Sequence, residues 1–217
     1  MQKEVQMPDN VSEFVWVNFL QGDSAAFSDI YNIYADGMFA YGSCFMDDAD
    51  LVKDAIHDIF LRLYNNRASV QTDNLKFYLL RAMKNEMYGI LRSKKEFCQV
   101  EENFHFFSPI YSVEDIYIEN EEETSLKKEV LSLLNSLTSR QKEAIYCRYM
   151  ENLSIQEIAD LMDMNYQSVQ NLIQRSMERL RKTYTTLPED SQIKERRTRL
   201  GMNNEELLLI CLFILMN

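Results

Sequence analysis

The sequence has few residues that bend or interrupt a chain, with only five glycines and three prolines among 217 residues. It also lacks sustained stretches in which apolar and polar residues alternate, which argues against a β fold. Hydrophobic residues make up 46% of the chain, enough to form the core of a globular protein. We therefore expect an all-α fold of one or two small helical domains.

Residues for catalysis or metal binding are also scarce. The four cysteines form no C-x-x-C pair, and neither His57 nor His105 has a second histidine or cysteine at metal-site spacing. Glycine-rich phosphate-binding motifs and the G-x-S-x-G nucleophile motif are absent. We expect no enzyme activity, no cofactor, no metal and no small-molecule substrate. Isolated thiols and no N-terminal secretion signal predict a cytoplasmic protein.

Positive charge is in deficit, since the formal net charge is −11 and the pI is about 4.7. Such a chain as a whole should be repelled by nucleic acid. However, residues 96–123 contain nine acidic residues and no lysine or arginine, so this segment alone accounts for most of the excess. Aromatic residues are interspersed among the acids. We predict an acidic linker over 96–124, extended but with some docked aromatic side chains.

Helical spacing of apolar residues defines two units on either side of this linker. The first covers residues 11–95, with loops expected around Asp47–Asp50 and Asn65–Asn74, and it ends in the basic sequence LRSKK. The second covers residues 125–184. A tail over 185–217 ends in ten consecutive apolar residues, 207–216, too few to span a bilayer, which needs about 20. The tail can pack on the folded body, bind a partner or another copy, or touch a membrane.

The second unit carries two signatures of helix starts. Thr138 with Gln141, and Ser154 with Glu157, have the spacing of capping boxes. A helix over 154–162 is followed by a three-residue turn, 163–165, whose last residue, Asn165, can cap the next helix. A short helix, a tight turn and a longer helix are the elements of a helix-turn-helix. Ala159 would allow the two helices to cross closely.

The longer helix begins in the sequence NYQSVQNLIQR, residues 165–175. At about 3.6 residues per turn, Val169, Leu172 and Ile173 lie on one side. The amides of Gln167, Gln170, Asn171 and Gln174 lie on the opposite side. Side-chain amides suit the edges of bases in the major groove. Further along, the helix carries a local excess of positive charge, from Arg175, Arg179, Arg181 and Lys182 against Glu178 alone. Positive charge there suits contacts with DNA phosphates. We interpret this face as a DNA-reading face; the alternative is the polar surface of a helical bundle.

Residues 134–182 closely resemble region 4 of the extracytoplasmic-function (ECF) sigma factors, the promoter-recognition subunits of bacterial RNA polymerase. The first unit resembles region 2 of the same family in three places. These are GDSAAF at 22–27, DLVKDAIHDIFLRLY at 50–64 and FYLLRAMKNEMYGILRSKK at 77–95. His57, Phe77, Gly89 and Ser168 stand where the family more often has Gln, Trp, Asp and Thr. The resemblance implies two helical domains, the second containing the winged-helix-like region 4.

The resemblance also implies roles for individual residues. The residues expected to read the −35 promoter element are Gln167, Ser168, Gln170, Asn171, Gln174, Arg175 and Arg179. Those expected to bind the −10 element as single-stranded DNA are Asn85, Tyr88, Arg92, Lys94 and Lys95. Those expected to bind core RNA polymerase are Asp54, His57, Asp58, Phe60 and Arg62. The expected partners are core polymerase and promoter DNA, with an anti-sigma factor left open.

Two other classes of protein share some of these features. A free-standing helix-turn-helix regulator would have the same recognition helix but no need for the first unit. An adaptor that keeps the sigma fold without melting promoters would show departures such as those at His57, Phe77 and Gly89. The acidic linker is open to two interpretations: it follows a basic channel of the polymerase, or it is merely solvated.

Overall fold

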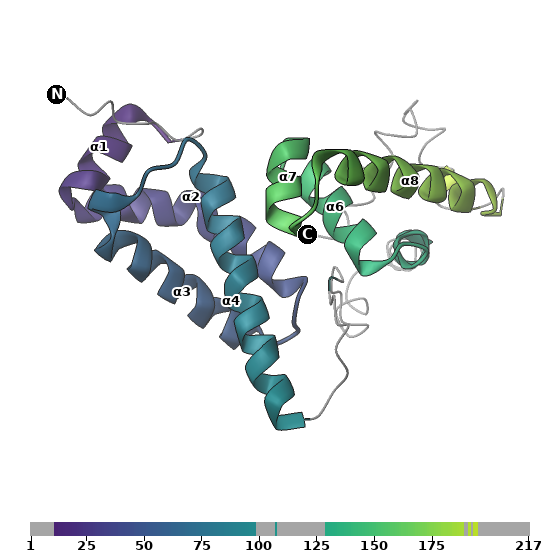
Figure 1. The fold of residues 1–217 in the computed structure, drawn as a ribbon, viewed down its shortest axis with the longest axis horizontal. Helices are drawn as coiled ribbons and strands as arrows, with labels where there is room; N and C mark the ends of the chain where they lie inside the picture. Colours follow the sequence, from purple (N-terminus) through teal and green to yellow (C-terminus); the bar gives the residue numbers. More distant parts are fainter. Residues whose placement is uncertain (1–10, 99–106, 108–128, 189–190, 192, 195–217) are drawn as a thin grey trace. The chain divides into compact units, whose positions relative to one another are not determined.

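The computed structural model describes residues 11–98, 107, 129–188, 191 and 193–194 (Figure 1). These residues form helices and connecting turns, with no strand among them, so the predicted all-α class is confirmed. No β wing therefore accompanies the helix-turn-helix within the described ranges. The chain divides into two compact units, Met1–Phe104 and His105–Asn217.

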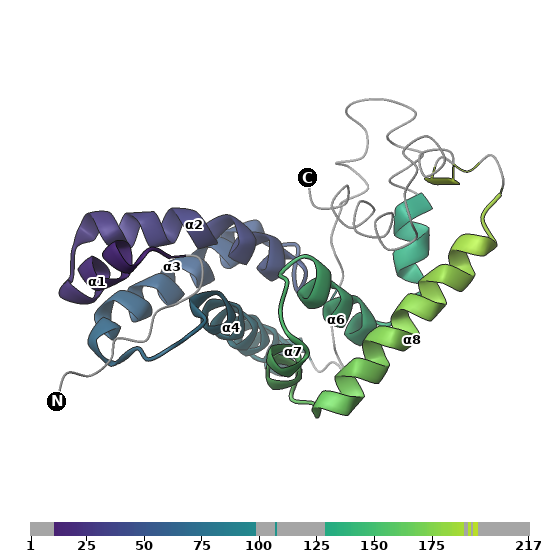
Figure 2. The same cartoon turned by 90° about the horizontal axis from the view of Figure 1, so that it is seen from above.

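Over residues 11–98, the first unit has four α-helices and a short 3-10 helix. They are α1 (Glu13–Gln21), α2 (Ser24–Ser43), α3 (Ala49–Asn65), η1 (Arg67–Ser69) and α4 (Leu75–Cys98). Helix α2 packs against α1, α3 and α4, and α3 also packs against α4 (Figure 2). The loops predicted around residues 47–50 and 65–74 coincide with the connections on either side of α3.

The GDSAAF sequence forms the corner between α1 and α2. Gly22 ends α1 in the left-handed conformation, with φ of 93°, and its backbone N–H donates to the carbonyl of Phe19. Asp23 then caps α2, its Oδ1 accepting from the backbone N–H of Ala25 at 2.7 Å. The hydroxyl of Tyr64 donates to the Gly22 carbonyl at 3.0 Å, which ties this corner to the end of α3.

The core of the first unit is rich in aromatic residues. Trp16 is 1% exposed, Phe19 is 0% exposed, and their ring centroids are 5.3 Å apart. Tyr41 is also fully buried and stacks edge-on against Phe45 at 5.2 Å. Large rings buried in this way contribute much of the hydrophobic stabilisation of a small domain.

Two glycines of α2 provide a matched pair for testing how tightly this core is packed. A Cβ atom at Gly42 would lie 2.2 Å from Cε of Met83 and 2.9 Å from Cγ1 of Val52, whereas nothing lies within 4 Å of one at Gly37. We expect Gly42→Ala to lower the free energy of unfolding by about 1–3 kcal/mol through overpacking. Gly37→Ala should raise it by about 0.5–1 kcal/mol through helix propensity. Urea denaturation of both variants measures this, and shifts of the same sign would contradict the packing around Gly42.

The second unit contains α6 (Ser139–Tyr149), α7 (Ile155–Met162) and α8 (Tyr166–Thr185), and residues 129–135 are also helical. Helix α8 packs against both α6 and α7. Between α6 and α7, the Tyr146 hydroxyl donates to Oε1 of Glu151 at 3.1 Å, and both side chains are buried. This bond satisfies two polar groups inside the unit and fixes the turn that leads into α7.

Two segments of the second unit outside these helices also pack against it. Phe107, from the predicted linker, is 1% exposed and its ring lies 5.4 Å from that of Tyr146, so a docked linker aromatic is confirmed at this position. At the start of the tail, Oε2 of Glu129 accepts from the Ser191 hydroxyl at 2.7 Å and from the Ile193 backbone N–H at 3.1 Å. The apolar run 207–216 lies outside the described residues.

The predicted domain limits, 11–95, 96–124, 125–184 and 185–217, stay predictions, because most of the linker and tail lies outside the described residues. Within the described ranges, no helix combines the length and the apolar character that crossing a membrane requires.

Candidate nucleic-acid interface

Two capping boxes fix the starts of α6 and α7, as the sequence predicts. At α7, the Ser154 hydroxyl accepts from the backbone N–H of Glu157 at 3.2 Å, and the Glu157 carboxylate accepts from the backbone N–H of Ser154 at 2.7 Å. Thr138 and Gln141 exchange the equivalent pair of bonds at α6, at 3.4 and 3.0 Å. Because each box satisfies two backbone donors, the first turn of each helix is well defined.

The turn between α7 and α8 is equally specific. Asp163 ends α7 in the left-handed conformation, with φ of 51°. Asn165 then caps α8, its Oδ1 accepting from the backbone N–H of Ser168 at 2.8 Å, as predicted. Ala159 is 1% exposed on α7, which packs against α8. Together these contacts fix the direction in which α8 leaves the turn and complete the helix-turn-helix.

Helix α8 has the two faces that the sequence predicts. Val169, Ile173 and Leu180 are buried, at 0%, 8% and 1% exposure, and Ser176 is buried beside them. All four predicted amide residues are exposed: Gln167, Gln170, Asn171 and Gln174. Ser168 is half-buried at the capped end. The exposed face is therefore polar and rich in groups that both donate and accept hydrogen bonds.

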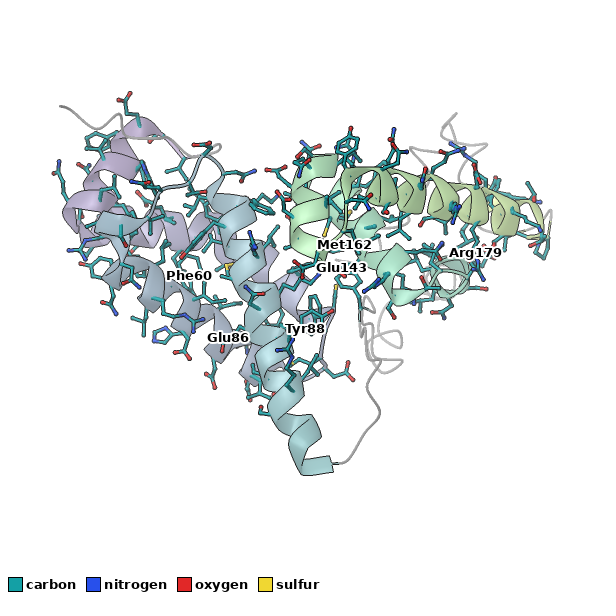
Figure 3. All side chains as sticks on the ribbon, in the orientation of Figure 1. Phe60, Glu86, Tyr88, Glu143, Met162 and Arg179 are labelled. Carbon is teal, nitrogen blue, oxygen red and sulfur yellow. The ribbon has the colours of Figure 1, made fainter. Side chains whose placement is uncertain are left out.

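Hydrogen bonds between side chains link successive turns of this face. Nε2 of Gln167 donates to Oδ1 of Asn171 at 3.4 Å, and Nε2 of Gln174 donates to Oε1 of Glu178 at 3.0 Å. Beyond them, four basic side chains are exposed: Arg175, Arg179, Arg181 and Lys182. Figure 3 labels Arg179 on this helix. The amides thus lie nearer the start of α8 and most of the cationic groups nearer its end.

The second unit also holds a cation in an unfavourable environment. Nζ of Lys142, on α6, donates to Oδ1 of Asn135 at 3.2 Å. Burial lowers the pKa of Lys142, because desolvation disfavours the charged ammonium. The hydrogen bond to Asn135 offsets part of that cost and connects α6 to the helical residues before it.

Most residues predicted to bind polymerase share the solvent face of α3. Asp54, His57 and Asp58 are exposed there. Arg62 is exposed as well and forms an ion pair with Glu86 of α4. Phe60 is different: it is 1% exposed, with its ring 4.7 Å from that of Tyr31 and 6.2 Å from that of Phe27 (Figure 3). The Phe60 side chain forms part of the core, and its predicted role in polymerase binding stays a prediction.

Residues predicted to bind the −10 element lie along α4. Asn85 and Arg92 are exposed, and Tyr88 is half-buried. The Tyr88 ring lies edge-on to Phe45 at 5.8 Å, and Nζ of Lys84 lies 5.7 Å from its centroid. The side chains of Lys94 and Lys95 are outside the described residues. Helix α4 thus carries the Asn85 amide, the Arg92 guanidinium and, between them, a Tyr88 ring that packs against Phe45.

Sequence reasoning missed two exposed residues beside these surfaces. Tyr166, the first residue of α8, is 49% exposed and precedes the amide face. Leu61 is 43% exposed on α3, three and four residues after Asp58 and His57, and therefore on the same stripe. The signals that could have found them are the position of Tyr166 next to the cap and the helical spacing of Leu61.

The fold and this face define a helical protein with a helix-turn-helix domain whose second helix exposes amide and basic side chains. Residues 127–180 match the family described as sigma-70, region 4. This match covers α6 and α7 and extends along α8 as far as Leu180.

Known proteins extend the similarity to most of the chain. This chain is 26% identical over 174 residues to the ECF RNA polymerase sigma factor SigW of Bacillus subtilis (strain 168), and the alignment covers 75% of this chain and 90% of SigW. Its identity to SigM of the same organism is 20% over 163 residues, covering 72% and 93% of the two chains. The sigma factor RpoE of Bartonella quintana, solved in complex with the anti-sigma factor NepR, has a similar fold. Its TM-score is 0.53 and its identity 18%, with 75% and 98% covered.

This chain is therefore an ECF RNA polymerase sigma factor of the sigma-70 family. Proteins of this family direct RNA polymerase to promoters and carry out no catalysis of their own.

Proposed function

We propose that this sigma factor contacts its promoters with two separate surfaces and core RNA polymerase with a third. The observation that carries the proposal is the exposed polar face of α8 in a capped helix-turn-helix. In such motifs the start of the second helix enters the major groove. The amides of Gln167, Gln170, Asn171 and Gln174 would then read base edges of the −35 element, with Ser168 beside them. Arg175 reaches a guanine or a phosphate, and Arg179 reaches the backbone.

The second promoter surface is on α4. Exposed Asn85 and Arg92, with Tyr88 between them, present groups that suit unpaired bases and phosphates of the −10 element. Phe45 packs against the Tyr88 ring, so the ring loses little conformational freedom when a base stacks on it. Lys94 and Lys95 belong to the same proposal through their positions at the end of α4.

The polymerase surface is the solvent face of α3. Asp54, His57 and Asp58 supply its polar groups, and Leu61 adds an exposed apolar side chain on the same stripe. Phe60 lies on the buried side of α3 and supports this surface by packing α3 against α2. The Arg62–Glu86 ion pair links α3 to α4. A polar stripe around one apolar side chain resembles the rim and centre of a protein–protein interface.

The same proposal covers location and control. The protein would act in the cytoplasm, where the polymerase and the promoters are. An anti-sigma factor would hold it inactive, as the Bartonella quintana relative is found in complex with one.

Run-off transcription tests this function. Core bacterial polymerase is incubated with genomic fragments, with and without the chain, and transcript starts are mapped. We expect new transcripts that share one upstream sequence at −35 and −10. No new transcripts together with no binding to core polymerase would overturn the proposal and favour a free-standing regulator. Binding to core polymerase without new transcripts from the genomic fragments would point instead to an adaptor that keeps the sigma fold but does not melt promoters.

A further inference from the structure

Glu178 is an acidic residue on the stripe of α8 that we assign to DNA. At about 3.6 residues per turn it lies in line with Gln167, Asn171 and Gln174. Four basic residues surround it in the sequence: Arg175, Arg179, Arg181 and Lys182. A carboxylate in this place repels phosphates and so weakens general affinity for DNA. General affinity for DNA therefore does not explain an acidic residue at this position.

The Glu178 carboxylate forms a hydrogen bond with the side chain of Gln174. Nε2 of Gln174 donates to Oε1 of Glu178 at 3.0 Å, and both side chains are exposed. An ionised carboxylate can only accept hydrogen bonds, so the nitrogen of the Gln174 amide must be the atom that faces it. The Gln167–Asn171 pair has no such constraint, because two amides can bond in either orientation. Gln174 is thus the amide on this face whose orientation is set by chemistry.

The orientation decides which bases Gln174 can accept. With one N–H of Nε2 bonded to Glu178, the Gln174 amide has only its second N–H left to donate, whereas Oε1 stays fully available to accept from the groove. In the major groove, adenine N6 and cytosine N4 are donors, whereas guanine and thymine present acceptors. An unrestrained glutamine can rotate its amide to serve either kind of base. One that is held by Glu178 favours adenine or cytosine on the strand it contacts.

We propose that Glu178 is a positioning residue that fixes Gln174 as a hydrogen-bond acceptor and thereby sets one base preference within the −35 element. This inference rests on the proposed function, because it requires α8 to read that element. Glu178 would exchange some general affinity for discrimination at a single position.

The test uses the full chain bound to core polymerase and a series of promoter duplexes, each altered at one position of the −35 element. Dissociation constants are measured for the unaltered protein, Glu178→Ala, Gln174→Ala and the double variant. At one position the unaltered protein should prefer adenine or cytosine by roughly tenfold. Glu178→Ala should reduce that preference to less than about threefold while tightening binding to every duplex. Both residues are exposed, so a melting curve suffices to show that each variant is folded.

The double variant separates positioning from charge. If Glu178 acts through Gln174, then adding Glu178→Ala to Gln174→Ala changes the affinity for all duplexes equally and alters no base preference. Uniformly tighter binding by Glu178→Ala alone, with the original base preference intact, would overturn the inference and leave Glu178 as a charge only. A complete lack of base preference at −35 in the unaltered protein would instead overturn the proposed function.

Discussion

Replacing Phe60 by alanine should lower the free energy of unfolding by about 3–5 kcal/mol, as expected for a large ring removed from a packed core. The side chain is 1% exposed and contacts the rings of Tyr31 and Phe27. Domains of this kind have a net stability of about 5–15 kcal/mol, so the variant would be only marginally folded. The single tryptophan, Trp16, is buried in the same unit, so its fluorescence during urea denaturation reports this loss directly.

A surface variant of the same helix provides the control. Asp58 is exposed two residues earlier, and we expect Asp58→Ala to change stability by no more than about 0.5 kcal/mol. It should nevertheless weaken binding to core polymerase, whereas Phe60→Leu, which keeps an apolar side chain of intermediate size, should retain most of both properties. A fully stable Phe60→Ala protein that had lost polymerase binding would show that the ring is a contact residue after all.

The local features of the fold could be predicted from the sequence because their causes are local. Capping boxes depend on residues three apart, and the faces of α8 follow from helical spacing, so Ser154, Asn165 and Val169 behave as predicted. Phe60 shows the limit of a motif match. Its spacing with Ile56 and Leu63 indicates a buried stripe, and the side chain is buried. The family motif assigns it to polymerase binding, and that role stays a prediction.

Contacts between distant parts of the chain were not predictable in this way. Arg62 pairs with Glu86, 24 residues further on, and Glu129 binds Ser191, 62 residues further on. No periodicity connects such positions, since tertiary packing alone brings them together. From the sequence alone, Glu178 is only a negative charge that reduces the positive charge of this helix. Its bond to Gln174 became evident from the hydrogen bonds of the structure.

The position of a residue along α8 should determine whether its loss affects specificity or general affinity. Gln170 lies in the second turn and is exposed, so Gln170→Ala should cost about 1–3 kcal/mol for promoters with the preferred base at one −35 position. At other sequences it should cost little, because the lost contact is to a base edge. Equilibrium binding of the polymerase complex to the substituted duplexes measures the difference.

Arg179 is the matched control, since it is exposed on the same helix about 14 Å further along its axis. From there a guanidinium reaches phosphates rather than base edges, so Arg179→Ala should weaken binding to all duplexes alike. It should also reduce the slope of log affinity against log salt by about 1. Because phosphate contacts carry no sequence information, the two variants must differ in kind if α8 lies in the major groove by its first turns. Equal loss of specificity from both would mean that α8 lies across the groove in another way, and would remove the basis for assigning its amides to bases.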